Sequence, residues 1–138
     1  MILDELARHL QDNGIGTVGT NIFKSYSPNK PDSLLIIYET GGERPQDTFG
    51  STNVAAWENP RIQIISRSTE YQFARNKAES AFRVLIGIAN QTIKASSLDS
   101  GSFYLRVNAI QSPFRLGIDE NSRNLVACNF AVMKTIST

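Results

Sequence analysis

Carboxylates are the side chains of this sequence that come closest to a catalytic arrangement. Glu39, Glu43, Asp47, Asp119 and Glu120 include pairs that could share general acid and general base work. The pair at 119 and 120 lies in a predicted turn, where acidic residues are common. The residues at 43 and 47 lie in a predicted loop. We therefore interpret these carboxylates as solvated side chains rather than catalytic groups.

Nucleophilic, phosphate-binding and metal-binding motifs are missing from the sequence. It contains no Gly-x-x-x-x-Gly-Lys-Ser/Thr loop, no Gly-x-Ser-x-Gly elbow, and no His-x-x-x-His or Cys-x-x-Cys pair. The glycines at 14, 16 and 19 resemble a dinucleotide fingerprint but lack the strand that must precede one. A serine nucleophile would need a histidine base, and His9 is the only histidine. The sequence predicts a protein that is not an enzyme and uses no metal and no cofactor.

Composition indicates an ordinary soluble globular domain. Of the 138 residues, 41% are hydrophobic and 20% are charged. The net charge of +1 does not predict the clustered basic face of a nucleic-acid-binding protein. The single cysteine, Cys128, excludes an intrachain disulfide and a cysteine-cluster metal site, and its apolar neighbours predict burial. We expect one domain over residues 1–138.

Neither a membrane span nor a signal peptide is predicted. No apolar run approaches the roughly 20 residues that a transmembrane helix needs. The N-terminal segment carries acidic residues early and lacks a basic region followed by an apolar core. We therefore expect a protein that folds in a cytoplasm and has no membrane partner.

The stretch from Asn59 to Ile93 has the most regular pattern and predicts a strand followed by one long helix. Ile62 and Ile64 alternate with polar residues in the strand, which covers residues 59–67. The helix is predicted to continue to Ile93. Its expected inner face includes several alanines, whose small side chains allow close packing. This face consists of Tyr71, Ala74, Ala78, Ala81, Phe82, Leu85, Ile88, Ala89 and Thr92.

Other elements complete the predicted fold. Residues 2–13 predict a short amphipathic helix that buries Leu6 and Leu10, places Glu5 on its polar face, and ends at Asn13-Gly14. Further strands are predicted over residues 21–26, 34–39, 102–111 and 123–136, with a short apolar piece over residues 114–118. This order predicts an α+β fold, in which a mixed or antiparallel sheet carries the short N-terminal helix and one long central helix.

A long flexible loop is predicted over residues 40–58, which are rich in Gly, Ser, Thr and Pro. Loops of this length are uncommon in compact domains and are usually functional or mobile. Two interpretations carry equal weight: a tolerated surface loop, or an arm that orders against a partner with Phe49 or Trp57 as its anchor. For Trp57 itself, which adjoins the strand, core packing is expected.

Three stretches give the chain a resemblance to the tail terminator (minor capsid, tail completion) proteins of long-tailed bacteriophages. The first is the N-terminal helix ending at Asn13-Gly14. The second is Asn59-Pro-Arg-Ile-Gln-Ile-Ile-Ser-Arg67, which leads directly into a helix with small residues. The third is the closing hairpin, with Pro113, Leu116-Gly117, an acidic turn, Arg123, and a strand containing Asn129-Phe130.

The resemblance implies a virion assembly protein of the tail or neck, made in the host bacterial cytoplasm. It implies a closed homo-oligomeric ring of six copies that caps the tail tube, ends tube polymerisation and joins the tail to the head-side connector or neck protein. DNA would only pass through the lumen of the ring. Candidate interface residues come from the predicted loop and from the outer side of the long helix: Glu43, Arg44, Asp47, Phe49, Arg75 and Arg83.

Two other functions stay open at this point. A head-completion or neck adaptor protein would share the same composition. A small α+β ligand-binding domain, with the loop as a lid, would need a pocket with convergent polar groups, and the scarcity of His and Cys argues against it.

Overall fold

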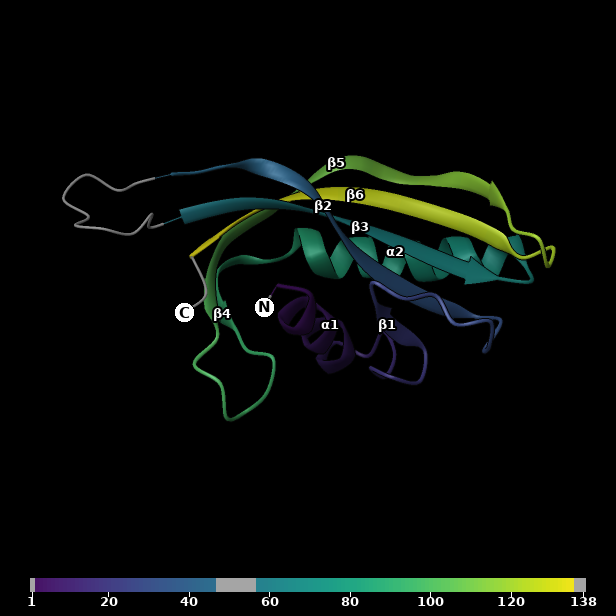
Figure 1. Ribbon diagram of the computed structural model, residues 1–138, viewed down its shortest axis with the longest axis horizontal. Coiled ribbons are helices and arrows are strands. Elements are labelled where there is room, and N and C mark those ends of the chain that lie inside the picture. Colours follow the sequence, from purple (N-terminus) through teal and green to yellow (C-terminus); the bar gives the residue numbers. More distant parts are fainter. Residues whose placement is uncertain (1, 47–56, 136–138) are drawn as a thin grey trace.

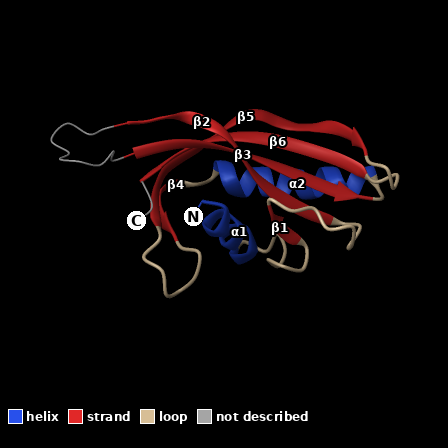
Figure 2. Ribbon diagram, in the orientation of Figure 1, coloured by secondary structure: helices blue, strands red, loops and turns tan. Residues whose placement is uncertain are grey.

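The computed structural model describes residues 2–46 and 57–135, with side chains described in 2–42 and 57–135. Within the described ranges, neither helix is long and apolar enough to cross a membrane. Figures 1 and 2 show the elements in these ranges: α1 (Ile2–Asp12), β1 (Ile22–Lys24), β2 (Leu34–Gln46), β3 (Trp57–Ser68), α2 (Tyr71–Ile86), β4 (Ala89–Ile93), β5 (Ser102–Ile118) and β6 (Asn124–Thr135).

The strands form one curled sheet in the order β1-β2-β3-β6-β5-β4. β1 runs parallel to β2, and every other neighbouring pair is antiparallel. Both helices lie on the same side of the sheet, so the molecule has two layers (Figure 1). α2 packs across β3, β6 and β5, whereas α1 contacts β1, β2 and β4. The opposite face of the sheet carries no helix of the described chain.

The core lies between the helices and the sheet. α1 buries Leu6 and Leu10 completely, and α2 buries its row of small residues, including Ala74, Ala78 and Ala81. Because alanine side chains are short, they let the α2 backbone approach the sheet closely. The alternation predicted for β3 is confirmed, since Ile62 and Ile64 are fully buried beneath the helices.

The predicted fold class is wrong, because the fold is mostly β and has no long central helix. α2 ends at Ile86, and Ala89–Ile93 is strand β4, paired with β5 from Ala89↔Arg106 to Ile93↔Ser102. Gly87, a poor helix former, follows the last helical residue. In residues 89–93, the backbone N–H and C=O groups pair with β5 instead of with groups of the same helix. Short apolar stretches do not distinguish the two structures by periodicity alone.

Two further segments differ from their predictions. The strand expected over residues 102–111 and the short apolar piece over residues 114–118 form one long strand, β5. Its pairing with β6 shifts register on both sides of Gln111 and continues past Pro113. In the segment predicted as a flexible loop, residues 40–46 belong to β2 and Trp57 and Glu58 belong to β3. Residues 47–56 lie outside the described part of the chain. Trp57 is half-buried and packs edge-on against Phe103, with ring centroids 6.3 Å apart.

Cys128 lies on the inner face of β6, and burial raises the pKa of its thiol to about 12. Because the thiolate is the reacting species, we expect no reaction of the native protein with a thiol-specific chromogenic disulfide at neutral pH. One thiol per chain should react after unfolding in guanidinium chloride. Rapid labelling of the native protein would show instead that this part of the sheet opens readily.

Candidate assembly surface

The sheet leaves strand edges unpaired on both of its sides. β1 pairs with β2 only from Leu35 to Ile37, so residues 38–46 of β2 have no neighbouring strand on that side within the described chain. β4 pairs with β5 only as far as Arg106. Residues 107–118 of β5 are therefore also a free edge among the described residues. A free edge presents backbone N–H and C=O groups that can pair with another chain.

The free edge of β5 also carries exposed apolar side chains. Ile110, Leu116 and Ile118 expose 49%, 46% and 56% of their surface. Exposed apolar side chains on a free edge favour pairing with another chain. The geometry is suited to association with a protein partner.

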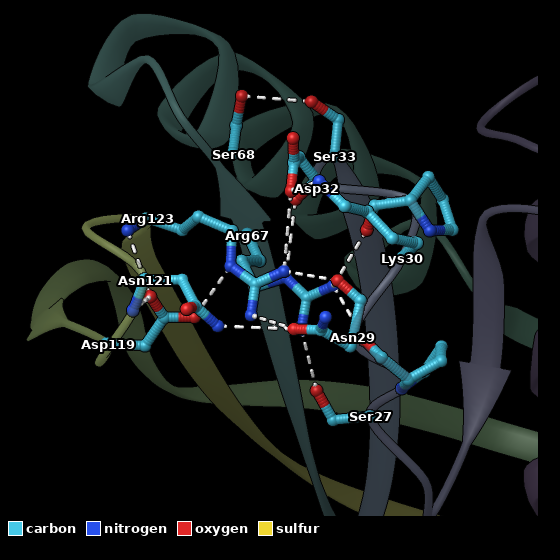
Figure 3. Close-up of polar contacts among 12 residues, drawn as sticks. Ser27, Asn29, Lys30, Asp32, Ser33, Arg67, Ser68, Asp119, Asn121 and Arg123 are labelled. Carbon is cyan, nitrogen blue, oxygen red and sulfur yellow. Dashed lines mark hydrogen bonds and ion pairs between the residues drawn. The ribbon is translucent and has the colours of Figure 1, made fainter.

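A polar cluster fixes the segment before β2 against the ends of β3 and β6 (Figure 3). At its centre, Arg67 is only 3% exposed. Its guanidinium donates to Ser27 Oγ at 3.0 Å and to four backbone carbonyl oxygens of residues 28–32, the two shortest being Pro28 and Pro31 at 2.7 Å each. Burial, followed by the nearby Arg123 guanidinium, lowers the pKa of Arg67.

The second arginine of the cluster is Arg123, which is 5% exposed. It donates to Asp119 Oδ2 at 2.8 Å and to the backbone carbonyl of Asn29, and it lies 3.5 Å from Asp32 Oδ1. The β5–β6 turn is thereby joined to the segment before β2, and Asn121 adds a hydrogen bond to Asn29 at 3.1 Å. Since both guanidinium groups are occupied by protein acceptors, this cluster is suited to anchoring chain segments rather than to binding an anion.

Both aspartates of the cluster are held in their charged form. Partial desolvation raises the pKa of Asp119, but hydrogen bonds from Arg123 and from the backbone of Asn121 outweigh it and lower the pKa below its usual value. A hydrogen bond from Lys30 lowers the pKa of Asp32, against a smaller opposing effect of desolvation.

The lowered pKa of Asp119 predicts acid sensitivity. A depressed folded-state pKa gives stability that is present above the ordinary value of 3.8 and is lost as the pH falls through the folded-state pKa. Asp119→Asn is therefore expected to reduce stability at neutral pH and to flatten the loss of stability below about pH 4. Urea unfolding midpoints at neutral and acid pH measure this, with the exposed neighbour Glu120→Gln as the control. If the unfolding midpoint falls by the same amount between neutral and acid pH in Asp119→Asn and in the parent, the predicted role of Asp119 is contradicted.

A second buried polar network joins α1 to the sheet, and sequence reasoning missed it. Glu5, predicted on the polar face of α1, is buried and accepts hydrogen bonds from Tyr104 Oη at 2.8 Å and Ser102 Oγ at 2.9 Å. Burial, then Glu5, raises the pKa of Tyr104. Lys134, 1% exposed, pairs with Glu58. The available signal was Lys134 itself, a cation on the same alternating face of β6 as the buried Phe130 and Val132.

The residues predicted as interface candidates are only partly brought together. Glu43 and Arg44 belong to the free edge of β2, and their side chains are not described. Asp47 and Phe49 lie outside the described residues. Arg75 and Arg83 both lie on α2, about 12 Å apart along its axis.

The two helix arginines differ in their surroundings. Arg75 is half-buried and donates to Glu79 Oε1 at 3.0 Å, whereas Arg83 is exposed in the last turn of the helix. The hydrogen bond that Arg75 donates to Glu79 raises the pKa of Arg75. Arg83 is therefore the more accessible of the two candidates.

The described residues contain no group of three or more His, Cys, Asp and Glu side chains placed to hold a metal ion. The acidic pair at 119 and 120 does not form a facing pair of carboxylates either, since Asp119 is engaged by Arg123 and Glu120 is exposed.

Comparison with known proteins identifies a family and a similar fold. A family model described as "Bacteriophage tail terminator protein" matches residues 9–136. Among solved structures, a chain of the "Virion of native gene transfer agent (GTA) particle" is similar with a TM-score of 0.55. The match covers 95% of this chain and 84% of that chain at 10% identity, so it shows a shared fold. No curated protein sequence matches the chain.

Proposed function

We propose that this chain, which belongs to the bacteriophage tail terminator family, forms a closed ring that caps the finished tail tube. As a member of this family it is a structural protein of the phage virion and serves in tail assembly. The proposed ring contains six copies, as the family resemblance implies. It ends tube polymerisation on one face and meets the head-side connector or neck protein with the other.

The observation that carries the proposal is the pair of free edges on opposite sides of one sheet. The β2 edge and the β5 edge consist of different residues, so a contact between them in neighbouring copies is head-to-tail. Head-to-tail contacts generate a ring when their rotation closes and a filament when it does not. Strand addition across the contact would satisfy the backbone groups that both edges leave unpaired.

The candidate interface residues fit this arrangement in different ways. Glu43 and Arg44 belong to the β2 edge, which supports a role between copies. Asp47, Phe49, Arg75 and Arg83 are proposed for contacts with the tube or the connector. The net charge of +1 suits a lumen through which DNA passes without being held.

Ring formation and tail capping test the proposal directly. Purified protein, alone at high concentration and with tail tubes, is imaged by negative-stain electron microscopy and sized by analytical ultracentrifugation. Rings and density at one end of the tubes are the expected results. A protein that stays monomeric and never associates with tubes would refute the proposal. Binding to tail-less heads while purified tails stay bare would identify a neck adaptor instead.

A further inference from the structure

We propose that Leu98 of one copy inserts into a cavity beside the start of α2 in the next copy. This inference rests on the proposed ring, and it adds a side-chain contact away from the free edges. The cavity and Leu98 are separate features of one chain, and each is described first on its own.

The cavity lies where the start of β2, the end of β3 and the first turns of α2 meet. Its volume is about 320 Å³. A cavity of about 150 Å³ already accommodates a benzene-sized group, so one aliphatic side chain and its neighbouring atoms fit. The lining residues come from four segments: Asn21, Ser33, Leu34, Leu35, Ser66, Arg67, Ser68, Phe73 and Lys77.

Two lining residues indicate that the cavity receives an occupant. The Ser66 hydroxyl is buried and has no hydrogen-bond partner in the part of the chain that the structure describes. Buried polar groups without a partner are rare in folded proteins, and a backbone group of an inserted loop could supply one. Phe73 is 62% exposed, an unusual state for a large aromatic side chain beside an apolar cavity.

Leu98 has the properties of a group that fills such a cavity. It is 95% exposed, the highest value among the exposed large apolar side chains of the described chain. It lies in the connection between β4 and β5, which extends away from the sheet in Figure 1. The connection is held in a turn, because Ser96 Oγ accepts from Leu98 N at 3.3 Å and donates to Asp99 Oδ2 at 3.2 Å. A preformed turn loses less conformational entropy on binding.

Charge complementarity favours a second copy of this chain as the occupant. Asp99 directly follows Leu98, and Lys77 lines the cavity. The Lys77 ammonium donates to the Ile15 carbonyl at 2.7 Å, which leaves two of its three N–H donors for another acceptor. Insertion of Leu98 would thus bring a carboxylate toward an ammonium group.

The positions of the two features also suit a ring. Figure 1 shows the β4–β5 connection and the start of α2 at opposite ends of the molecule. A contact between them joins different surfaces of neighbouring copies, so it is head-to-tail, like the contact proposed for the free edges.

Cross-linking between introduced cysteines tests the contact. In the variant Leu98→Cys/Phe73→Cys, a short bis-maleimide should join successive copies into a ladder that extends beyond dimers on a denaturing gel. Each single variant can yield dimers at most, and the buried Cys128 thiol does not compete. A double variant that gives no ladder beyond these controls overturns the inference. If the parent protein still forms rings under the same conditions, the proposed function survives that result.

Charge placement supplies a second test. Leu98→Asp is expected to weaken self-association about tenfold or more, because it places a charge where the proposed contact buries an apolar side chain. Ser97→Asp, which introduces the same charge one residue earlier, is the matched control and should have a smaller effect. Equal association constants for Leu98→Asp and Ser97→Asp overturn the inference. Lys77→Glu should also weaken association, and Asp99→Lys in the same chain should restore it.

Discussion

Replacing Leu116 and Ile118 with lysine is expected to abolish ring formation while the monomer stays folded. Both side chains are about half exposed on the free edge of β5, so the free energy of unfolding should change by no more than about 0.5 kcal/mol. Lysines on an edge strand oppose pairing with another chain, because the charge would be desolvated there. Analytical ultracentrifugation and negative-stain imaging measure assembly, and urea unfolding measures stability.

The matched control for this double variant is Ile86→Lys. It makes the same kind of change at a residue that is 43% exposed at the end of α2, away from the β5 edge. Rings should still form in this control. Rings formed by the double variant at parental concentrations would show that the β5 edge is not a contact between copies.

Replacing Arg67 with methionine is expected to destabilise the protein by about 3 kcal/mol. Methionine retains much of the side-chain volume but leaves Ser27 Oγ and the carbonyl oxygens of Pro28 and Pro31 without the donor that Arg67 supplies. Buried acceptors that lose a partner bear the full cost of desolvation. Arg67→Lys should recover only part of the loss, since an ammonium group cannot reproduce the planar fork of a guanidinium. Denaturant unfolding measures both variants.

Hydrogen exchange locates the effect of this change. Faster exchange in Arg67→Met should concentrate in residues 25–33 and in the β5–β6 turn, which the arginine cluster joins. Arg83→Met is the control, because Arg83 is exposed on α2 and its loss should cost no more than about 0.5 kcal/mol. If Arg67→Met is as stable as this control, the cluster does not anchor the segment before β2.

Local patterns predicted the parts of the fold that depend on one face of one element. The inner face of α1, the alanine row of α2 and the alternation in β3 follow from spacing, because burial of one face requires apolar residues at a fixed period. The third stretch of the resemblance likewise corresponds to the β5–β6 hairpin. The family was also within reach of the sequence, since its motifs extend over most of the chain.

Patterns failed where a distant segment decides the structure. Residues 89–93 fit a helix by spacing, but β5 offers them a strand partner. Glu5 fits the polar face of α1, but Tyr104 and Ser102 reach it from a strand about a hundred residues later. Arg67 ends the strand predicted over residues 59–67, and no neighbouring residue indicates that the segment before β2 covers it. In each case a long-range hydrogen bond outweighed a local preference.

The sequence by itself determined that this is a phage tail protein without a recognisable catalytic constellation, and which residues form the inner faces of its main elements. Only the tertiary structure decided where α2 ends, which strand edges stay open, and that an exposed leucine and an apolar cavity lie at opposite ends of one molecule. Motifs and periodicities are properties of neighbouring residues. Free edges and cavities instead arise from the order of strands in the sheet and from their unequal lengths, which pairing between distant segments sets.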